Sequence, residues 1–309
     1  MSTRIATPYM FNRGVDVMLQ KQAELTRTEL QLADGKRILR PSDDPAATAQ
    51  LIDLKENKAK LDQYQRNADA VYARLGQEET ALEGIGNLLQ RVRELTVQGN
   101  NGALGAEQRE AVATELRQHV QNFVQLANTR DANDEYIFSG YSTDTEAISY
   151  TPPAASGATG TFTYNGDSGQ RMVKIADSRE VAMGDPGSIF MNIPASGGGP
   201  ATSIGAIIDD IAASFEAGSI APNGLTDLDA AIDRIATKRA GIGGRMNAID
   251  DQKAMNESFT LAVEQVRSSL EDLDYSEAIS RFNQQLTALQ ASQQSFMKIQ
   301  DLSLFNFLR

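Results

Sequence analysis

Residues 54–92 read LKENKAKLDQYQRNADAVYARLGQEETALEGIGNLLQRV, and their apolar residues repeat every seven positions. One heptad position is filled in six consecutive repeats by Leu54, Leu61, Ala68, Leu75, Leu82 and Leu89. The position three residues later carries Tyr64, Val71, Ile85 and Val92, with Glu78 as the exception. Apolar residues spaced 3.5 apart on average form a seam that packs against partner helices in a left-handed coil. The stretch therefore predicts a long helix from Pro45 to Gln98.

Two other regions have the same helical spacing. Near the N-terminus, the apolar residues that lie seven apart are Phe11, Met18, Leu25, Leu32 and Leu39. Toward the C-terminus, apolar residues recur every three or four positions from Leu228 to Ile299, although Gly241, Gly243 and Gly244 interrupt the pattern. A shorter helix is expected from about Ala106 to Thr129. The two ends of the chain are therefore predicted to be mostly helical.

Turn residues mark the boundary between the first two predicted helices. The first should end near Asp34 and Gly35, because glycine readily takes the left-handed conformation that follows a helix. The second should begin at Asp43-Asp44-Pro45, where a carboxylate can cap the helix and proline suits its first turn.

Proline and glycine gather in the middle of the chain. The 74 residues of the segment 151–224 hold 6 of the 9 prolines and 12 of the 24 glycines. Because proline costs about 3 kcal/mol inside a helix, long helices are excluded there. We expect short strands and turns, and the expected strands, loop and helix are Tyr136–Tyr141, Thr161–Tyr164, Met172–Ile175, a loop over 194–200 and a helix over Ile204–Phe215.

The predicted fold is mainly α, with a β-rich insert. A long coiled-coil-like helical bundle is built from both termini, and a small α+β or β domain lies outside it. The expected regions are terminal coiled-coil arms at 1–42 and 270–309, a helical core at 43–150 and 225–269, and an outer insert at 151–224. The arms differ in charge: the first has seven basic and four acidic residues, and the second has three and five. Two amphipathic arms of opposite charge favour pairing with each other.

Composition excludes several classes of function. The 309 residues include no cysteine and one histidine, which rules out disulfides, a cysteine nucleophile and a multi-histidine zinc site. A net charge of −12 argues against binding to nucleic-acid phosphates. No apolar run approaches the roughly 20 residues that span a bilayer, and the start of the chain lacks the apolar region of a cleaved signal. We expect a soluble protein, or one exported without cleavage.

No residue pattern predicts catalysis or a metal or cofactor site. His119 is expected to be an ordinary histidine at the flank of the third helix. The acidic pairs Asp43-Asp44, Asp209-Asp210 and Glu271-Asp272 point in directions about 100° apart on a helix, which favours a solvated face. By contrast, the last stretch, Ile299 to Arg309, is unusually apolar for a free end. A single helix cannot bury such a stripe, so we favour burial against neighbouring subunits over docking on the chain's own body.

Several motifs resemble those of bacterial flagellins. They are Gly35-Lys36-Arg37-Ile38, the run from Pro41 to Ala47, and Leu88 to Gln98. Within that family, the sequence is similar to the members that join hook to filament. This similarity rests on Pro-Ser-Asp-Asp-Pro at 41–45, on Ala127-Asn128-Thr129 leading into Tyr136–Tyr141, and on the ending Leu302–Leu308.

The resemblance implies a structural role in the bacterial flagellum and no enzyme activity. Such proteins form a ring of identical copies between the first hook-associated protein and the flagellin filament. They leave the cell unfolded through the flagellar type III channel, and an export chaperone binds the C-terminal arm, here about Leu270 to Arg309. The expected location is extracellular, at the hook–filament junction, with no membrane insertion.

The resemblance also suggests which residues act in assembly. The expected packing residues are Phe11, Met18, Leu25, Leu32, Leu286, Leu289, Phe296, Phe305 and Leu308. Gln90, Arg91, Val92 and Glu94 match a flagellin segment that lies between subunits. Three alternatives stay open: a filament flagellin, an enzyme carried on a helical scaffold, and an intracellular coiled-coil tether.

Overall fold

The structure, a computed structural model, describes residues 3–196 and 200–307. They fall into two compact units: unit 1 lies within residues 1–60 and 259–309, and unit 2 comprises residues 61–258. Each unit is described by itself. The three regions expected from the sequence have other boundaries and stay a prediction. None of the described helices is long and apolar enough to cross a membrane.

The predicted long helices are present. They are α1 (Thr3–Asp34), α2 (Pro45–Gly99), α3 (Ala106–Ala127), α5 (Gly224–Glu271) and α6 (Tyr275–Phe307). α5 is continuous through its three clustered glycines, and an added Cβ at any of them would meet no atom within 4 Å. Each of these glycines therefore borders open space, and together they lower the helical propensity of α5 without breaking the helix.

The ends of the first two helices follow the predicted chemistry. Gly35 has φ +68° and closes α1 by donating its N–H to the Gln31 carbonyl at 2.9 Å. At the start of α2, Asp44 Oδ1 accepts the Ala47 N–H at 3.0 Å. This bond satisfies one of the free donors in the first turn of the helix.

The middle of the chain contains two small antiparallel sheets. In one, β1 (Ile148–Thr151) pairs with β2 (Thr161–Tyr164), and in the other β3 (Met172–Ala176) pairs with β4 (Arg179–Ala182). Two of the predicted strands are thus confirmed, as is the helix α4 (Ile204–Glu216). Of the loop expected over 194–200, residues 197–199 lie outside the described part of the chain.

The strand predicted over Tyr136–Tyr141 is wrong. Those residues form turns with one isolated bridge, between Arg130 and Tyr136, and Gly140 has φ +70°. Ile137 and Phe138 are nevertheless buried. These aromatic and β-branched side chains pack into the core from a loop. The residue types that suggested a strand are therefore explained by burial.

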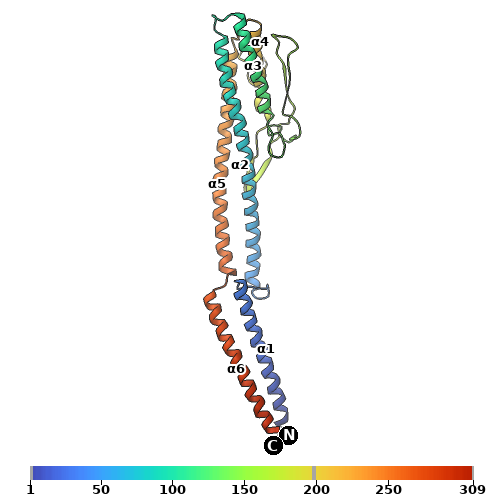
Figure 1. Cartoon of the computed structure of the whole chain (residues 1–309), viewed down its shortest axis with the longest axis vertical. Coiled ribbons are helices and arrows are strands. Elements are labelled where there is room, and N and C mark those ends of the chain that lie inside the picture. The colour runs from blue at the N-terminus through green and yellow to red at the C-terminus, as the bar shows by residue number, and fades with distance from the viewer. Residues whose placement is uncertain (1–2, 197–199, 308–309) are drawn as a thin grey trace. The chain divides into compact units, whose positions relative to one another are not determined.

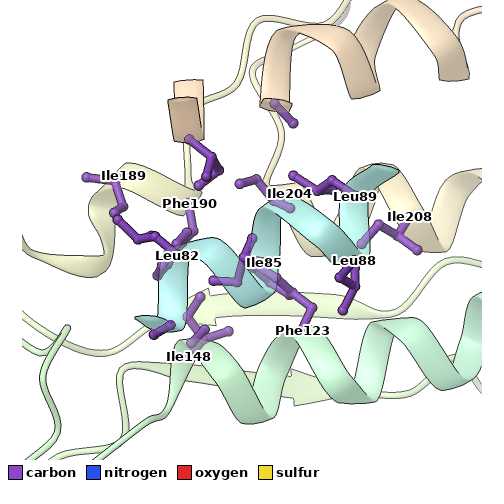
Figure 2. Close-up of a cluster of buried hydrophobic side chains, with 14 of the residues drawn as sticks. Leu82, Ile85, Leu88, Leu89, Phe123, Ile148, Ile189, Phe190, Ile204 and Ile208 are labelled. Atoms are coloured by element: carbon purple, nitrogen blue, oxygen red, sulfur yellow. The ribbon is translucent and has the colours of Figure 1, made fainter. Parts of the chain in front are cut away.

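The core of unit 2 forms along the heptad seam of α2 (Figure 2). Leu82, Ile85 and Leu89 are fully buried there, together with Phe123 of α3. Phe190 of the short helix η1 (Gly187–Phe190) meets the Phe123 ring edge-on, at a centroid distance of 5.7 Å. The seam of α2 therefore packs on the β-containing segment as well as on another helix.

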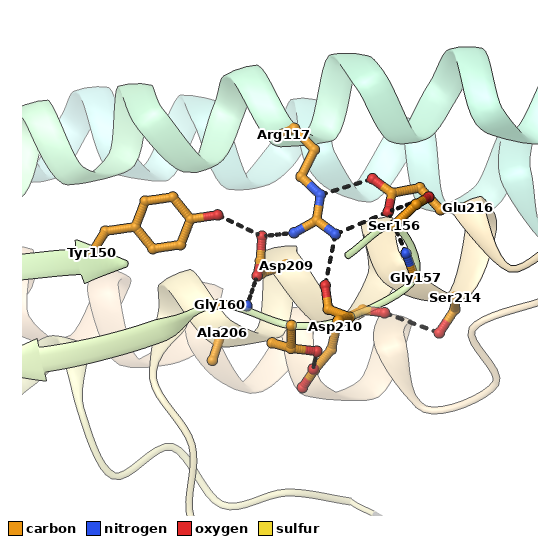
Figure 3. Close-up of polar contacts among 12 residues, drawn as sticks. Arg117, Tyr150, Ser156, Gly157, Gly160, Ala206, Asp209, Asp210, Ser214 and Glu216 are labelled. Carbon is orange, nitrogen blue, oxygen red and sulfur yellow. Dashed lines mark hydrogen bonds and ion pairs between the residues drawn. The ribbon is translucent and has the colours of Figure 1, made fainter. Parts of the chain in front are cut away.

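An ionic network fastens α4 to α3 (Figure 3). Arg117 of α3 pairs with Asp209, which is fully buried, and with Glu216 at 2.8 Å. The same guanidinium donates to the Ala158 carbonyl at 2.8 Å, and Tyr150 Oη donates to Asp209 at 3.2 Å. A buried carboxylate is stable only when paired and hydrogen-bonded. Asp209 is therefore a buried structural residue, and the solvated face expected for the Asp209-Asp210 pair is wrong for Asp209.

Glu78, the exception in the heptad pattern, ties the segment after β4 to α2. Its side chain is buried and accepts the Asp185 N–H at 3.1 Å. Asp185 is also buried and pairs with Arg245 of α5. Burial and the neighbouring Asp185 charge raise the pKa of Glu78 to about 8. The folded state therefore holds a proton that the unfolded chain releases near pH 4.5.

This proton makes stability depend on pH. Because the folded pKa of Glu78 lies above its unfolded value, its favourable contribution is complete below pH 4.5 and is lost as the pH rises through 8. Relative to Glu78→Gln, the free energy of unfolding of the wild type should fall by about 1.4 kcal/mol per pH unit in that window. Urea unfolding from pH 5 to 9 measures the difference. Glu83→Gln, at an exposed position of the same helix, should parallel the wild type; equal pH profiles for all three proteins would contradict the assignment.

Candidate assembly interface

The two terminal helices of unit 1, α1 and α6, lie side by side and contact each other (Figure 1). They run antiparallel: the Phe11 and Phe296 rings lie 5.0 Å apart, and Arg281 donates to Gln31 at 3.5 Å. An added Cβ at Gly14 would lie 3.0 Å from the Phe296 ring, so glycine permits this close approach. The expected pairing of the two arms is therefore present within one chain.

The seam itself repeats every three or four residues. Buried and half-buried residues at this spacing in α1 are Met18, Lys21, Leu25, Thr28 and Leu32, and those in α6 are Ala278, Phe282, Gln285, Leu289, Ser292 and Phe296. This is the spacing of a two-helix coiled coil. Six of these eleven seam residues are large and apolar, and each helix has further large apolar residues outside the seam.

A second set of apolar side chains points away from the seam. Leu19 and Leu30 of α1 are 56% and 48% exposed, and Ile279, Leu286 and Met297 of α6 are 50%, 36% and 55% exposed. Leu19 and Leu30 are eleven residues apart, about three helical turns, and so share one face of α1. Ile279 and Leu286, seven residues apart, share a face of α6. We call these five residues the outward stripes.

The loop after α1 is clamped to the end of α5. The Arg37 guanidinium donates a hydrogen bond to the Leu270 carbonyl at 2.9 Å. The backbone N–H of Arg37 donates to the Glu271 carbonyl at 2.8 Å. Lys36 pairs with Glu271 at 2.6 Å, and the Leu273 N–H bonds to Gly35. The Gly35–Ile38 motif therefore fixes the point at which the arm begins.

Both acids of the Pro-Ser-Asp-Asp-Pro motif have structural partners. Asp43 Oδ2 accepts the Leu39 and Arg40 N–H groups, and its other oxygen pairs with Arg27 at 2.9 Å. Asp44 caps α2, and the Ala47 N–H lowers the pKa of its carboxyl group. Within residues 3–196 and 200–307, no cluster of three or more histidines and carboxylates could hold a metal ion.

The flagellin-like segment of α2 has one exposed face. Gln90, Arg91 and Glu94 are exposed, and Arg91 pairs with Glu94 at 3.1 Å and with Glu115 of α3 at 2.8 Å. Val92 is fully buried and belongs to the core, so within this chain it offers no surface to a subunit. His119 lies close by, half-buried, with its Nε2 atom 3.8 Å from Glu115.

The predicted packing residues divide between the seam and the outward stripes. Met18, Leu25, Leu32, Leu289 and Phe296 lie in the seam inside the chain, and Phe11 contacts Phe296. Leu286 is exposed. Leu308 and the side chain of Phe305 lie outside the described residues. The other four outward-stripe residues are not among the predicted packing residues, because the strongest seven-residue spacing marks the seam.

Comparison with known proteins shows which proteins this chain resembles. The bacterial flagellin N-terminal helical region matches residues 5–143, and the bacterial flagellin C-terminal helical region matches residues 225–308. Flagellar hook-associated protein 3 of Escherichia coli (strain K12) is 29% identical over 312 residues, 98% of each chain. The Salmonella typhimurium (strain LT2) protein of that name is 26% identical over 99% of this chain and 100% of its own. Flagellins also match, over smaller parts of this chain.

The solved structures show the same fold. A putative flagellar hook-associated protein from Vibrio parahaemolyticus superposes with a TM-score of 0.62 and 26% identity. The superposition covers 74% of this chain and 100% of that one.

Two leucines three residues apart on α6 allow the buried seam and the outward stripe to be tested separately. Leu289, 9% exposed, lies in the seam, and Leu286 lies in an outward stripe. Leu289→Ala should lower the free energy of unfolding of the helix pair by about 2 kcal/mol, whereas Leu286→Ala should change it by less than about 0.5 kcal/mol. Urea titrations followed by helical circular dichroism measure both. Equal losses would mean that the seam is assigned to the wrong face.

Proposed function

The chain belongs to the bacterial flagellin family, and we propose that it is the axial structural protein that joins the flagellar hook to the flagellin filament. The observation that carries this proposal is the alignment over nearly the full length with two proteins named flagellar hook-associated protein 3. Flagellins align over smaller shares of the chain, which favours a hook-associated protein over a filament subunit.

The geometry of unit 1 supports a role in assembly. In a pair of helices, each helix can bury one face against the other, and α1 and α6 already bury one face of each in this way. The outward stripes still expose five large apolar residues. Apolar surface of this kind is stabilised by removal from water, at about 25 cal/mol per Å². We propose that copies of this chain cover these stripes when they stand side by side in a ring.

The partners follow from this position at the junction. The ring would rest on the first hook-associated protein and carry flagellin on its other side. Before assembly, an export chaperone would cover the C-terminal arm, about Leu270 to Arg309, where Leu286 and Met297 are exposed. We propose that the protein leaves the cell through the flagellar export channel and acts outside it. The exposed residues Gln90, Arg91 and Glu94 are candidates for further subunit contacts.

Deletion of the gene tests the junction role. A cell without this protein should build hooks but retain no filaments, because flagellin would have no surface on which to start. Flagellin should then accumulate in the medium, where immunoblotting detects it, while electron microscopy counts hooks and filaments. Normal filaments on the deletion strain would refute the proposal. If the purified chain polymerised alone into long filaments, it would be a filament flagellin instead.

The outward stripes can be tested without unfolding the chain. Leu286→Asp adds a charge at a position that is exposed in the single chain but covered in the proposed ring. We expect unchanged unfolding of the purified protein and at least a tenfold loss of filament-bearing cells, since an unpaired buried charge costs several kcal/mol. Gln284→Asp introduces the same charge at an exposed position outside the stripes and serves as the control. Equal filament counts for the two variants would show that this stripe is not covered.

A further inference from the structure

The dipeptide Asn-Gly occurs three times in unit 2, at residues 101–102, 165–166 and 223–224. In this dipeptide the backbone nitrogen of the glycine can attack the side-chain amide of the asparagine, because glycine has no side chain to hinder the approach. The attack needs an asparagine side chain that folds over the next peptide and a glycine nitrogen that is free of other bonds. The three copies therefore place the same chemistry in three structural settings.

The copy at Asn223-Gly224 is held by the first turn of α5. Gly224 is buried, and its N–H donates to the Ala221 carbonyl at 3.3 Å. The Asn223 carbonyl accepts the Asp227 N–H at 3.0 Å. An added Cβ on Gly224 would lie 2.8 Å from Ile211, so the glycine also has no room to turn. Attack by this nitrogen would break the start of the helix, and the site is therefore protected.

The copy at Asn165-Gly166 is held in the turn after β2. The Asn165 N–H donates to the Ala147 carbonyl at 2.9 Å, and its side-chain amide donates to the Glu146 carbonyl at 3.4 Å. An added Cβ on Gly166 would lie 2.6 Å from Tyr164 Oη. The asparagine side chain is thus engaged elsewhere, and the glycine has little room for the rotation that attack requires.

The copy at Asn101-Gly102 is open, in the turn between α2 and α3. Asn101 Oδ1 accepts the Ala103 N–H at 3.0 Å, a bond that folds the side chain back over the Gly102 peptide. Gly102 is exposed, and an added Cβ on it would meet no atom within 4 Å. Within the described part of the chain, the Gly102 N–H donates no hydrogen bond. This copy therefore has both the folded side chain and the free nitrogen.

The Ala103 N–H is also placed to stabilise the charge that the attack creates. The side-chain oxygen of Asn101 becomes negative as the nitrogen adds to its carbon, and this donor is already bound to that oxygen. A donor fixed where charge develops lowers the barrier of a reaction. The preceding residue gives a contrast: Asn100 Nδ2 donates to the Ala221 carbonyl at 3.2 Å, and its Oδ1 accepts the Ala221 N–H at 2.8 Å. The Asn100 side chain is therefore bound and unreactive.

We propose that Asn101 is a site of spontaneous modification in the folded protein. The Gly102 nitrogen loses its proton to a base in the solvent and bonds to the Asn101 Cγ. The bond from Cγ to Nδ2 breaks, and the amide nitrogen takes up a proton and leaves as ammonia. Water then opens the resulting cyclic imide at either carbonyl, which gives aspartate or isoaspartate. Each event adds one negative charge to the turn, and water is the only co-reactant.

The surroundings of the turn can accept the product. The Arg109 guanidinium lies beside it and donates to the carbonyls of Gly99 and Asn101, at 3.1 and 3.4 Å. The new carboxylate also precedes α3, and the N-terminal end of a helix favours negative charge. The modified chain should therefore stay folded and accumulate with the age of the protein.

Peptide mapping by mass spectrometry tests the site. The folded full chain is incubated at slightly alkaline pH in water enriched in oxygen-18, whose uptake marks the events that precede digestion. We expect conversion at Asn101 at least tenfold faster than at Asn165 or Asn223, because those two sites must first open locally. In urea that unfolds the chain, the three rates should become similar, since the dipeptide is the same.

Two glycine variants separate the chemistry from the fold. Gly102→Ala enters open space at a residue without positive φ, so the turn should persist while the added methyl group hinders attack. Conversion at Asn101 should slow at least tenfold. Gly76→Ala also enters open space, but within α2 and away from the turn, and should leave the rate at Asn101 unchanged.

Several results would overturn the inference. Equal rates at the three sites of the folded chain would do so, as would faster conversion at Asn165 or Asn223. Conversion at Asn101 that Gly102→Ala leaves unchanged would point to direct hydrolysis instead. If Asn101 converts in urea but not in the folded chain, the turn protects it and the inference is wrong. The junction role is independent of each of these results.

Discussion

A helix in a two-helix pair can shelter only one of its faces, and unit 1 is organised around this constraint. α1 and α6 bury a seam spaced every three or four residues, in which Gly14 and Phe296 allow close approach. The seam leaves leucine, isoleucine and methionine exposed on other faces. Among the described residues of unit 1, nothing else covers these side chains, so the helix pair leaves apolar surface exposed to water.

Unit 2 meets the same constraint in another way. There the heptad seam of α2 is covered from several sides, by Phe123 of α3 and by the β-containing segment with Phe190. Polar interactions then join the middle segment to the helices. Arg117 forms an ion pair with the buried Asp209, and Glu78 accepts a hydrogen bond from the Asp185 N–H. Buried polar groups that are fully hydrogen-bonded in this way hold the elements that they join in a defined arrangement.

The sequence predicts the elements of this protein better than it predicts their partners. Helix ends depend on local chemistry, such as the left-handed Gly35 and the Asp44 cap, and these were predictable. The turns at Tyr136–Tyr141 were not, because burial in a loop and pairing in a strand favour the same residue types. Val92 and Leu286 show the limit for the site: spacing identifies an apolar position, but only the neighbouring elements decide whether it faces the core or the solvent.

Charge is distributed between the units in a way that suits assembly through unit 1. The residues of unit 2 include 27 acidic and 15 basic side chains, whereas residues 1–60 and 259–309 include 14 of each. If copies meet through unit 1 as proposed, they bring together surfaces without net charge, whereas contacts through the acidic unit 2 would meet net repulsion. A unit without net charge can therefore pack against its own copies, which is what the proposed ring of identical subunits requires.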